Sequence, residues 1–313
     1  MLSLFKKTAN SNSVRAGIAL GDGSFALAVV CRDDADKPRI QHCETHTAPG
    51  GAGPALKSLL DKLRASRSAA CAVVDGDDYQ IVQIEAPEVL PSEMRAAVRW
   101  RLRDAINFSV DEAAVDIFEI PDPVRRAQNK MLFAVAARDS AVQRIARTLK
   151  PTVKGFNAID IPELCLRNVS ALLPQDAKGV AMLAVGDTFA QLVITRQGVM
   201  YLTRRIDTAR RFTMHAQNRS EDIDAGALAL ELQRSLDYYE SHYDQSAIGD
   251  LVIAPANARS DRLVEALKNE TSLRISQLDV RELCNVYKSG ELIADWPCLM
   301  ALGAALRTDS VGL

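Results

Sequence analysis

The sequence lacks a hydrophobic run long enough to cross a membrane. Its longest apolar runs, such as residues 180–185, fall far short of the ~20 residues that a bilayer-spanning helix needs. Residues 1–7 place apolar side chains before two lysines and then turn polar, which is the wrong order for a secretory signal. We therefore expect a cytoplasmic protein with no membrane span.

An excess of charge of one sign is also absent. The chain has 38 Lys and Arg against 40 Asp and Glu, which gives a net charge of −2. Without a global basic field the protein has no general attraction for nucleic acid or anionic lipid. We expect no nucleic-acid partner.

Cysteine and histidine are sparse and scattered. The six cysteines form no Cys-x-x-Cys pair, so the sequence predicts reduced thiols in a cytosolic core and no disulfide framework. Four histidines offer no Ser-His-Asp or Cys-His arrangement. His42, Cys43 and His46 stand close together, but a second pair of ligands is lacking, so a surface strand and no metal site is predicted there.

The length and composition indicate a large globular protein. The chain has 313 residues, of which 48% are hydrophobic and 25% charged. That length exceeds what one typical hydrophobic core supports, so two lobes around a cleft are expected.

Two segments of the chain resemble each other. Residues 19–26 read ALGDGSFA and residues 184–190 read AVGDTFA, so the second copy has one turn residue fewer. Asp-Gly supplies the backbone angles of a tight turn, and an apolar strand follows each copy. An internal duplication is predicted, with each half opening on a strand-turn-strand hairpin.

The remaining pattern alternates strands and helices, which predicts an α/β protein. Amphipathic helices are expected at about 54–63, 90–107, 140–149, 226–243 and 261–269, with a small-residue helix at 297–307. The predicted first lobe covers 1–155 and contains a small α/β insert at about 79–150. A connector over 156–178 leads to a second lobe over 179–295, which contains a helical subdomain at about 208–246. A C-terminal helix over 296–313 is expected to pack back toward the first lobe.

Several motifs together resemble one family. They are Leu90-Pro91-Ser92-Glu93 through Trp100, the following Ile106-Asn107-Phe108 and Asp111-Glu112, residues 232–240, the opening 4–7 and the closing 301–307. The chain resembles the PilM-like family of actin-like type IV pilus assembly proteins, above all the branch that serves mannose-sensitive haemagglutinin (MSHA) pili. The resemblance implies the two-lobed actin-like fold of actin, Hsp70 and hexokinase, with a PilM-type insert in the first lobe.

The resemblance also implies a function. Such a protein is a cytoplasmic scaffold under the inner membrane that captures the cytoplasmic tail of a PilN-like membrane protein, in a groove on the first lobe beside the insert. The pilus motor ATPase is a second candidate partner. The candidate partner-binding residues are Leu90, Met94, Val98, Arg95 and Arg99. The three apolar ones are candidates only if they are exposed.

The loops that hold nucleotide in this fold are degenerate here. Actin-like ATPases typically end the first strand of each lobe in Asp-x-Gly, whose carboxylate holds hydrated magnesium. Ala19 and Ala184 occupy these positions, and Pro255-Ala256 replaces the paired glycines of the adenosine wall. The vestigial phosphate loops are Gly21, Asp22, Gly23 and Ser24 in the first half and Gly186, Asp187 and Thr188 in the second. We therefore expect a pseudo-ATPase with no cofactor, no catalytic residue and no metal site. ATP and magnesium are expected to bind weakly or not at all.

Other interpretations remain open. Asp22 and Asp187 would hold a displaced metal in an active ATP-binding ATPase or kinase, although stabilising a turn explains them more simply. A filament-forming actin relative is the structural alternative. Arg95, Arg99, Arg101 and Arg103, with Arg125 and Arg126, form a basic cluster that suits either an acidic protein or lipid surface or a solvated helix face.

Overall fold

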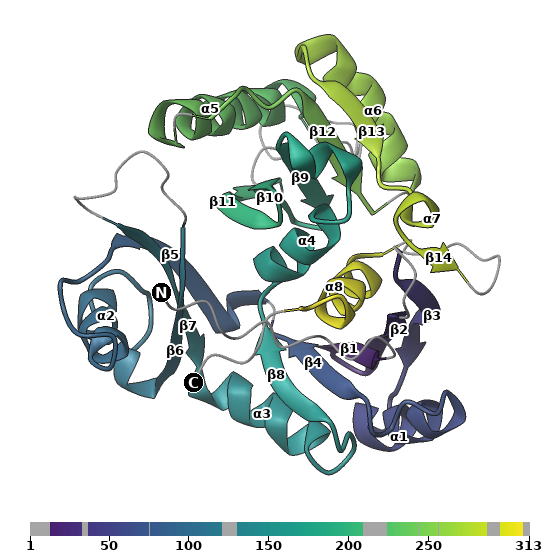
Figure 1. The fold of residues 1–313 in the computed structure, drawn as a ribbon. Coiled ribbons are helices and arrows are strands. Elements are labelled where there is room, and N and C mark those ends of the chain that lie inside the picture. Colours follow the sequence, from purple (N-terminus) through teal and green to yellow (C-terminus); the bar gives the residue numbers. More distant parts are fainter. Residues whose placement is uncertain are drawn as a thin grey trace, which may run out of the picture.

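The computed structural model describes residues 13–32, 37–74, 76–120, 130–208, 224–243, 245–255, 257–286 and 295–308. These residues form two larger sheets with helices between and around them, and a small third sheet at one side (Figure 1). No helix in these ranges is long and apolar enough to cross a membrane.

The first sheet has the strand order β14-β3-β2-β1-β4-β8. β1 and β2 form the predicted antiparallel hairpin with Asp22 and Gly23 in its turn, β2 and β3 are also antiparallel, and β4 runs parallel to both β1 and β8. The strands are β1 (Ser13–Gly21), β2 (Ser24–Arg32), β3 (Arg39–Thr47), β4 (Ala69–Val73), β8 (Phe156–Asp160) and the short β14 (Asn285–Val286).

The second sheet repeats this plan in the order β11-β10-β9-β12-β13. Its directions also match, since β9-β10-β11 is an antiparallel meander and β12 is parallel to β9 and β13. The strands are β9 (Val180–Val185), β10 (Phe189–Arg196), β11 (Val199–Asp207), β12 (Asp250–Ala254) and β13 (Arg274–Gln277). Ala19 lies opposite Val73 and Ala184 opposite Ala254, so the two alanines occupy equivalent places and the predicted duplication is confirmed.

Two helices, α4 (Pro162–Ser170) and α8 (Trp296–Ala305), lie between the sheets and pack on each other (Figure 1). The other helices cover the outer faces or join strands: α1 (Ala52–Lys62), α3 (Asp139–Leu149), α5 (Ala225–Tyr243), α6 (Ala258–Glu270) and α7 (Val280–Leu283), with short 3-10 turns at Gly76–Asp78, Val110–Glu112 and Pro174–Ala177. α5 buries the apolar stripe that the sequence predicts, from Leu228 to Tyr243.

The small third sheet and its helix form the insert, which we define as β5 (Tyr79–Glu85), α2 (Met94–Leu102), β6 (Ala113–Glu119) and β7 (Met131–Arg138). The strand order is β5-β7-β6, all antiparallel. Val98 and Leu102 of α2 are completely buried in a core of the insert's own. β5 was not predicted, because its residues YQIVQIE carry no turn signal and alternate only weakly.

The central helices approach the strands so closely that glycine is required. A Cβ atom at Gly17 of β1 would overlap the carbonyl oxygen of Ala301, and one at Gly303 of α8 would overlap the backbone of Cys165 in α4. These contacts allow β1, α8 and α4 to stack without a side-chain layer.

Two segments differ from the predicted division of the chain. Residues 156–178 are more than a connector, because they contribute β8 to the first sheet and the buried helix α4 between the sheets. β14, within the predicted second lobe, pairs with β3 of the first sheet. The positions of β8 and β14 depend on pairing with strands that are distant in sequence, and a local sequence pattern does not predict such pairing.

Candidate functional site

The first vestigial loop is an exposed hairpin turn. Gly23 adopts a positive φ of 62°, which Asp-Gly predicts, and Gly21 and Asp22 are exposed. A pocket of about 530 Å³ lies beside the turn, with described lining from residues 20–24, from 48–52, from the end of β4 and from α3, including Arg144. The described lining of this pocket therefore belongs to the first half of the chain.

The second vestigial loop is packed by aromatic side chains. The Gly186 amide donates to the carbonyl of Phe189 at 2.9 Å, so the hairpin itself uses this group. The ring of Phe189 meets the indole of Trp296 edge-on with centroids 5.0 Å apart, and the Arg205 guanidinium lies 3.8 Å from the Phe189 centroid. Asp187 and Thr188 remain exposed.

The two alanines at the positions predicted to lack a metal-orienting carboxylate differ in environment. Ala184 is completely buried in the main hydrophobic core, whereas Ala19 is partly buried against it. An unpaired carboxylate at position 184 would be strongly disfavoured by desolvation. Among the described residues neither Asp22 nor Asp187 belongs to a group of three or more potential metal ligands.

The vestigial adenosine wall is partly described. Pro255 is buried at the end of β12, and its carbonyl accepts a hydrogen bond from Ser260 Oγ at 2.6 Å. Ala256 lies outside the described residues, as do Arg125, Arg126 and residues 4–7.

The predicted partner-binding residues do not share one surface. Leu90 is 65% exposed and Met94 is partly buried, but Val98 is completely buried in the insert core and its assignment to a partner surface is wrong. Arg95 forms an exposed ion pair of 3.1 Å with Asp116. Arg99 donates to the carbonyls of Val110 and Ala113, so it joins α2 to the start of β6.

A groove of about 670 Å³ lies between the insert and the first sheet. β6 and β8, each the last strand of its sheet, contribute to its walls. Five elements and the segment after α8 supply the lining: Pro91, Ser92, Met94 and Arg95 at α2, Asp116, Ile117 and Phe118 on β6, Val135 on β7, Ile159, Asp160 and Ile161 at β8, Leu164 and Arg167 on α4, and Arg307 after α8.

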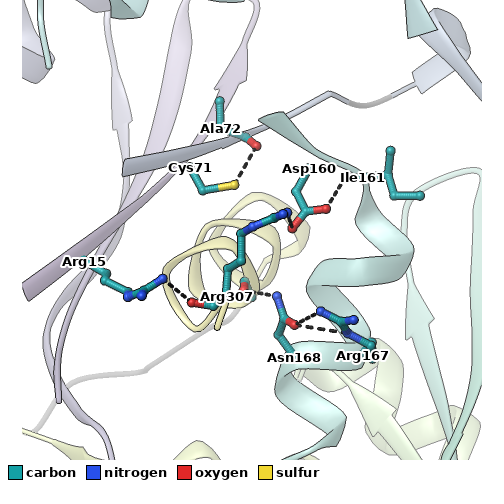
Figure 2. Close-up of polar contacts among 9 residues, drawn as sticks. Arg15, Cys71, Ala72, Asp160, Ile161, Arg167, Asn168 and Arg307 are labelled. Atoms are coloured by element: carbon teal, nitrogen blue, oxygen red, sulfur yellow. Dashed lines mark hydrogen bonds and ion pairs between the residues drawn. The ribbon is translucent and has the colours of Figure 1, made fainter. Parts of the chain in front are cut away.

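A buried ion pair lies in this groove (Figure 2). Arg307 Nη1 donates to Asp160 Oδ2 at 2.8 Å, and the Asp160 side chain is only 1% exposed. Burial raises the pKa of Asp160 above its ordinary value, although the Arg307 charge and hydrogen bond act in the opposite direction. The carboxylate is therefore held at an energetic cost.

The segment after α8 is anchored by further polar contacts (Figure 2). Arg15 donates to the carbonyl of Arg307, and Arg32 Nη2 donates to the carbonyl of Leu306 at 3.0 Å. Asn168 Nδ2 donates to the Gly303 carbonyl at 2.9 Å, and Arg167 donates to Asn168. The positive charges of Arg15 and Arg32 lie at the carbonyl end of α8, where they offset its negative dipole end. With the Asn168 bond, these contacts join α4, α8 and β1 at the groove. Sequence reasoning missed this network because Asp160 and Arg307 lie far apart in the chain and no local motif links them.

Comparisons with known proteins agree at the level of the fold. No family model matches the sequence, and no curated protein matches it. A chain of the PilM-PilN type IV pilus biogenesis complex is similar in structure, with 20% identity, a TM-score of 0.66, and coverage of 93% of this chain and 97% of that one. The cytoplasmic domain of EpsL, an inner-membrane component of the Vibrio cholerae type II secretion system, gives 10% identity, a TM-score of 0.52, and coverage of 95% and 97%. With its repeated sheet topology, this chain has the two-lobed actin-like fold.

Proposed function

We propose that this chain is a PilM-like cytoplasmic scaffold of a type IV pilus assembly platform, of the MshI type that serves MSHA pili. It binds the cytoplasmic tail of a PilN-like inner-membrane protein in the groove between β6 and β8. The observation that carries the proposal is this groove with its two sheet edges. Likeness over 93% of the chain to a chain of the PilM-PilN complex supports it.

The groove suits an extended peptide. An edge strand offers backbone donors and acceptors to a further strand, and neighbouring pockets select alternate side chains. Met94, Ile117 and Leu164 supply apolar walls. The Arg95–Asp116 and Arg307–Asp160 pairs place charges of both signs along the groove, which suits a tail that carries polar as well as apolar side chains.

The proposal includes the absence of catalysis. Ala19 and Ala184 offer no carboxylate to magnesium, and Phe189 and Trp296 pack against the second loop. The protein acts through its surfaces, with the pilus motor ATPase as a second partner. An active ATPase or kinase with a displaced metal is the alternative, and the pocket beside Asp22 is the feature that favours it.

The groove is tested with a synthetic peptide of the PilN-like tail from the same organism. The full chain should bind it in isothermal titration calorimetry, and its melting temperature should rise with peptide concentration because ligand binds only the folded state. Ser92 is exposed and lines the groove, so Ser92→Trp should block the peptide while the fold remains intact.

Ala96→Trp is the matched control, because Ala96 is an exposed residue of α2 outside the described groove lining. It should bind like the unmodified chain. A peptide that binds Ser92→Trp with unchanged affinity, or that fails to bind the unmodified chain at millimolar concentration, contradicts the proposal.

A further inference from the structure

Three potential metal ligands meet on β3, far from the groove in the first sheet. The Nε2 atoms of His42 and His46 lie 3.0 Å apart. The ligand atoms of His42, Glu44 and His46 all lie within 4.8 Å of one another. Residues at alternate positions of a strand point to the same face, so the spacing of two along β3 brings these side chains together.

The same alternation corrects the grouping suggested by the sequence. Cys43 points to the opposite face, where it is buried and its thiol contacts the carbonyl of Cys298 at 3.6 Å. Glu44 takes its place as the third ligand, since it shares the face of the two histidines. The sequence grouped His42, Cys43 and His46 and offered no further ligand pair. The geometry of β3 instead brings together His42, Glu44 and His46.

We propose that His42, Glu44 and His46 bind one divalent transition-metal ion of the Zn²⁺ class. Zinc bonds to imidazole nitrogen are about 2.0–2.1 Å long, so two such nitrogens in a tetrahedral site are separated by about 3.3 Å. The observed 3.0 Å separation needs only a small side-chain rotation to reach that value. Two imidazoles and one carboxylate leave a fourth position for water, and this donor set prefers zinc, cobalt, nickel or copper to magnesium or calcium.

Neighbouring contacts support the position of the ligands. The ring of His46 stacks on Phe25 of β2, with centroids 5.3 Å apart, and also faces His42 at 5.3 Å. Phe25 is almost completely buried, so it is a fixed surface for His46. In the metal-free protein the two imidazoles share a hydrogen bond, and the ion replaces the shared proton.

The ion would connect His42, Glu44 and His46 along the part of β3 that lies beyond its pairing with β14. β14 pairs with β3 only at Arg39 and Ile40, so within the described residues the backbone of the stretch from His42 to His46 pairs with one strand, β2. The site lies close to the first vestigial loop, because Ala48 donates to the carbonyl of Gly23 at 2.7 Å. Metal binding should therefore protect this edge and its turn from opening.

The test uses the full chain, freed of metal with a chelator and titrated with Zn²⁺ and, separately, with Co²⁺. Zinc should bind with a stoichiometry of one and raise the melting temperature. Cobalt should give the visible absorption of a tetrahedral nitrogen–oxygen site without a thiolate charge-transfer band. A thiolate band would assign the metal to a cysteine and overturn the proposal.

Variants locate the site. His42→Gln and His46→Gln should each weaken zinc binding by about tenfold or more, because each removes one of three protein ligands. His242→Gln is the control, since His242 lies on α5, and it should leave binding unchanged. Hydrogen exchange should show zinc-dependent protection of β3 in the unmodified chain and not in the His42→Gln, His46→Gln double variant. Equal zinc affinity in the unmodified chain and this double variant overturns the proposal, and so does the absence of zinc binding by the unmodified chain.

Discussion

Two buried carboxylates, Asp160 and Asp176, have polar partners within the described residues. Asp160 pairs with Arg307 beside the groove, and Asp176 accepts from Thr195 Oγ1 at 2.7 Å near the start of the second sheet. Burial raises the pKa of both carboxyls. Of the six cysteines, Cys31 alone is partly exposed, and burial raises the pKa of Cys284 to about 11. The pKa values of these groups are raised by burial, so they depend on the folded structure around each side chain.

Asp160→Asn tests whether burial or Arg307 dominates the ionisation of Asp160. A raised pKa in the folded state means that Asp160 contributes most to stability below the ordinary Asp pKa of about 3.9. That contribution is lost as the pH rises through its raised folded value. The free energy of unfolding of the unmodified chain relative to Asp160→Asn should therefore fall between acidic and neutral pH, as measured by urea unfolding across that range. A difference that grows with pH would show that Arg307 outweighs burial.

At the scale of elements, the stack of β1, α8 and α4 holds the two sheets together. Gly17 and Gly303 permit the backbone contacts in this stack, and α4 and α8 are buried on almost every side. Arg15 and Arg32 fix the carbonyl end of α8. Because Leu164 and Arg167 of α4 and Arg307, just after α8, line the groove, the shape of the groove depends on the packing of this stack.

Gly303→Ala should destabilise the protein. The added methyl group would overlap the backbone of Cys165, and inserting atoms into a packed core costs about 1–3 kcal/mol, occasionally more. Gly50→Ala is the control, because nothing lies within 4 Å of its Cβ position. Urea unfolding should show a lower free energy of unfolding for Gly303→Ala and a value close to the unmodified one for Gly50→Ala. Equal stability of the two variants would mean that α8 moves freely relative to α4.

At the scale of the whole molecule, the two sheets share one topology. Under the proposed function their first strands lack the carboxylates that would hold magnesium, because Ala19 and Ala184 stand at those positions. Ala19 and Ala184 occupy equivalent register positions in the two halves. The insert adds a groove where it meets β8 at the edge of the first sheet. Under the proposed function, the protein works by binding a partner beside the insert.

Calorimetry with magnesium and ATP tests the proposed weakness of nucleotide binding. Losing two charge-assisted contacts at ~1.5–3 kcal/mol each should move a micromolar site to about the millimolar range. Dissociation in the low micromolar range would restore the ATPase alternative. Placing aspartates at positions 19 and 184 cannot serve as a rescue, because Ala184 is completely buried and an unpaired charge there would destabilise the fold by several kcal/mol.

The sequence by itself determined the local elements and their repetition. Asp-Gly fixed the turn of the first hairpin, the apolar stripe from Leu228 to Tyr243 fixed the face of α5, and the repeated GD motif indicated two equivalent halves. Each of these signals lies within a short stretch of chain, where turn chemistry and helical or strand period act directly.

Tertiary structure alone decided which residues meet. It buried Val98 and Ala184, paired Asp160 with Arg307, and placed β8 and β6 at the two edges of a groove. Burial and pairing depend on which distant strand or helix covers a face, and a single sequence does not specify that partner. The strand alternation was predictable on β3, but the approach of its two imidazoles required the folded chain.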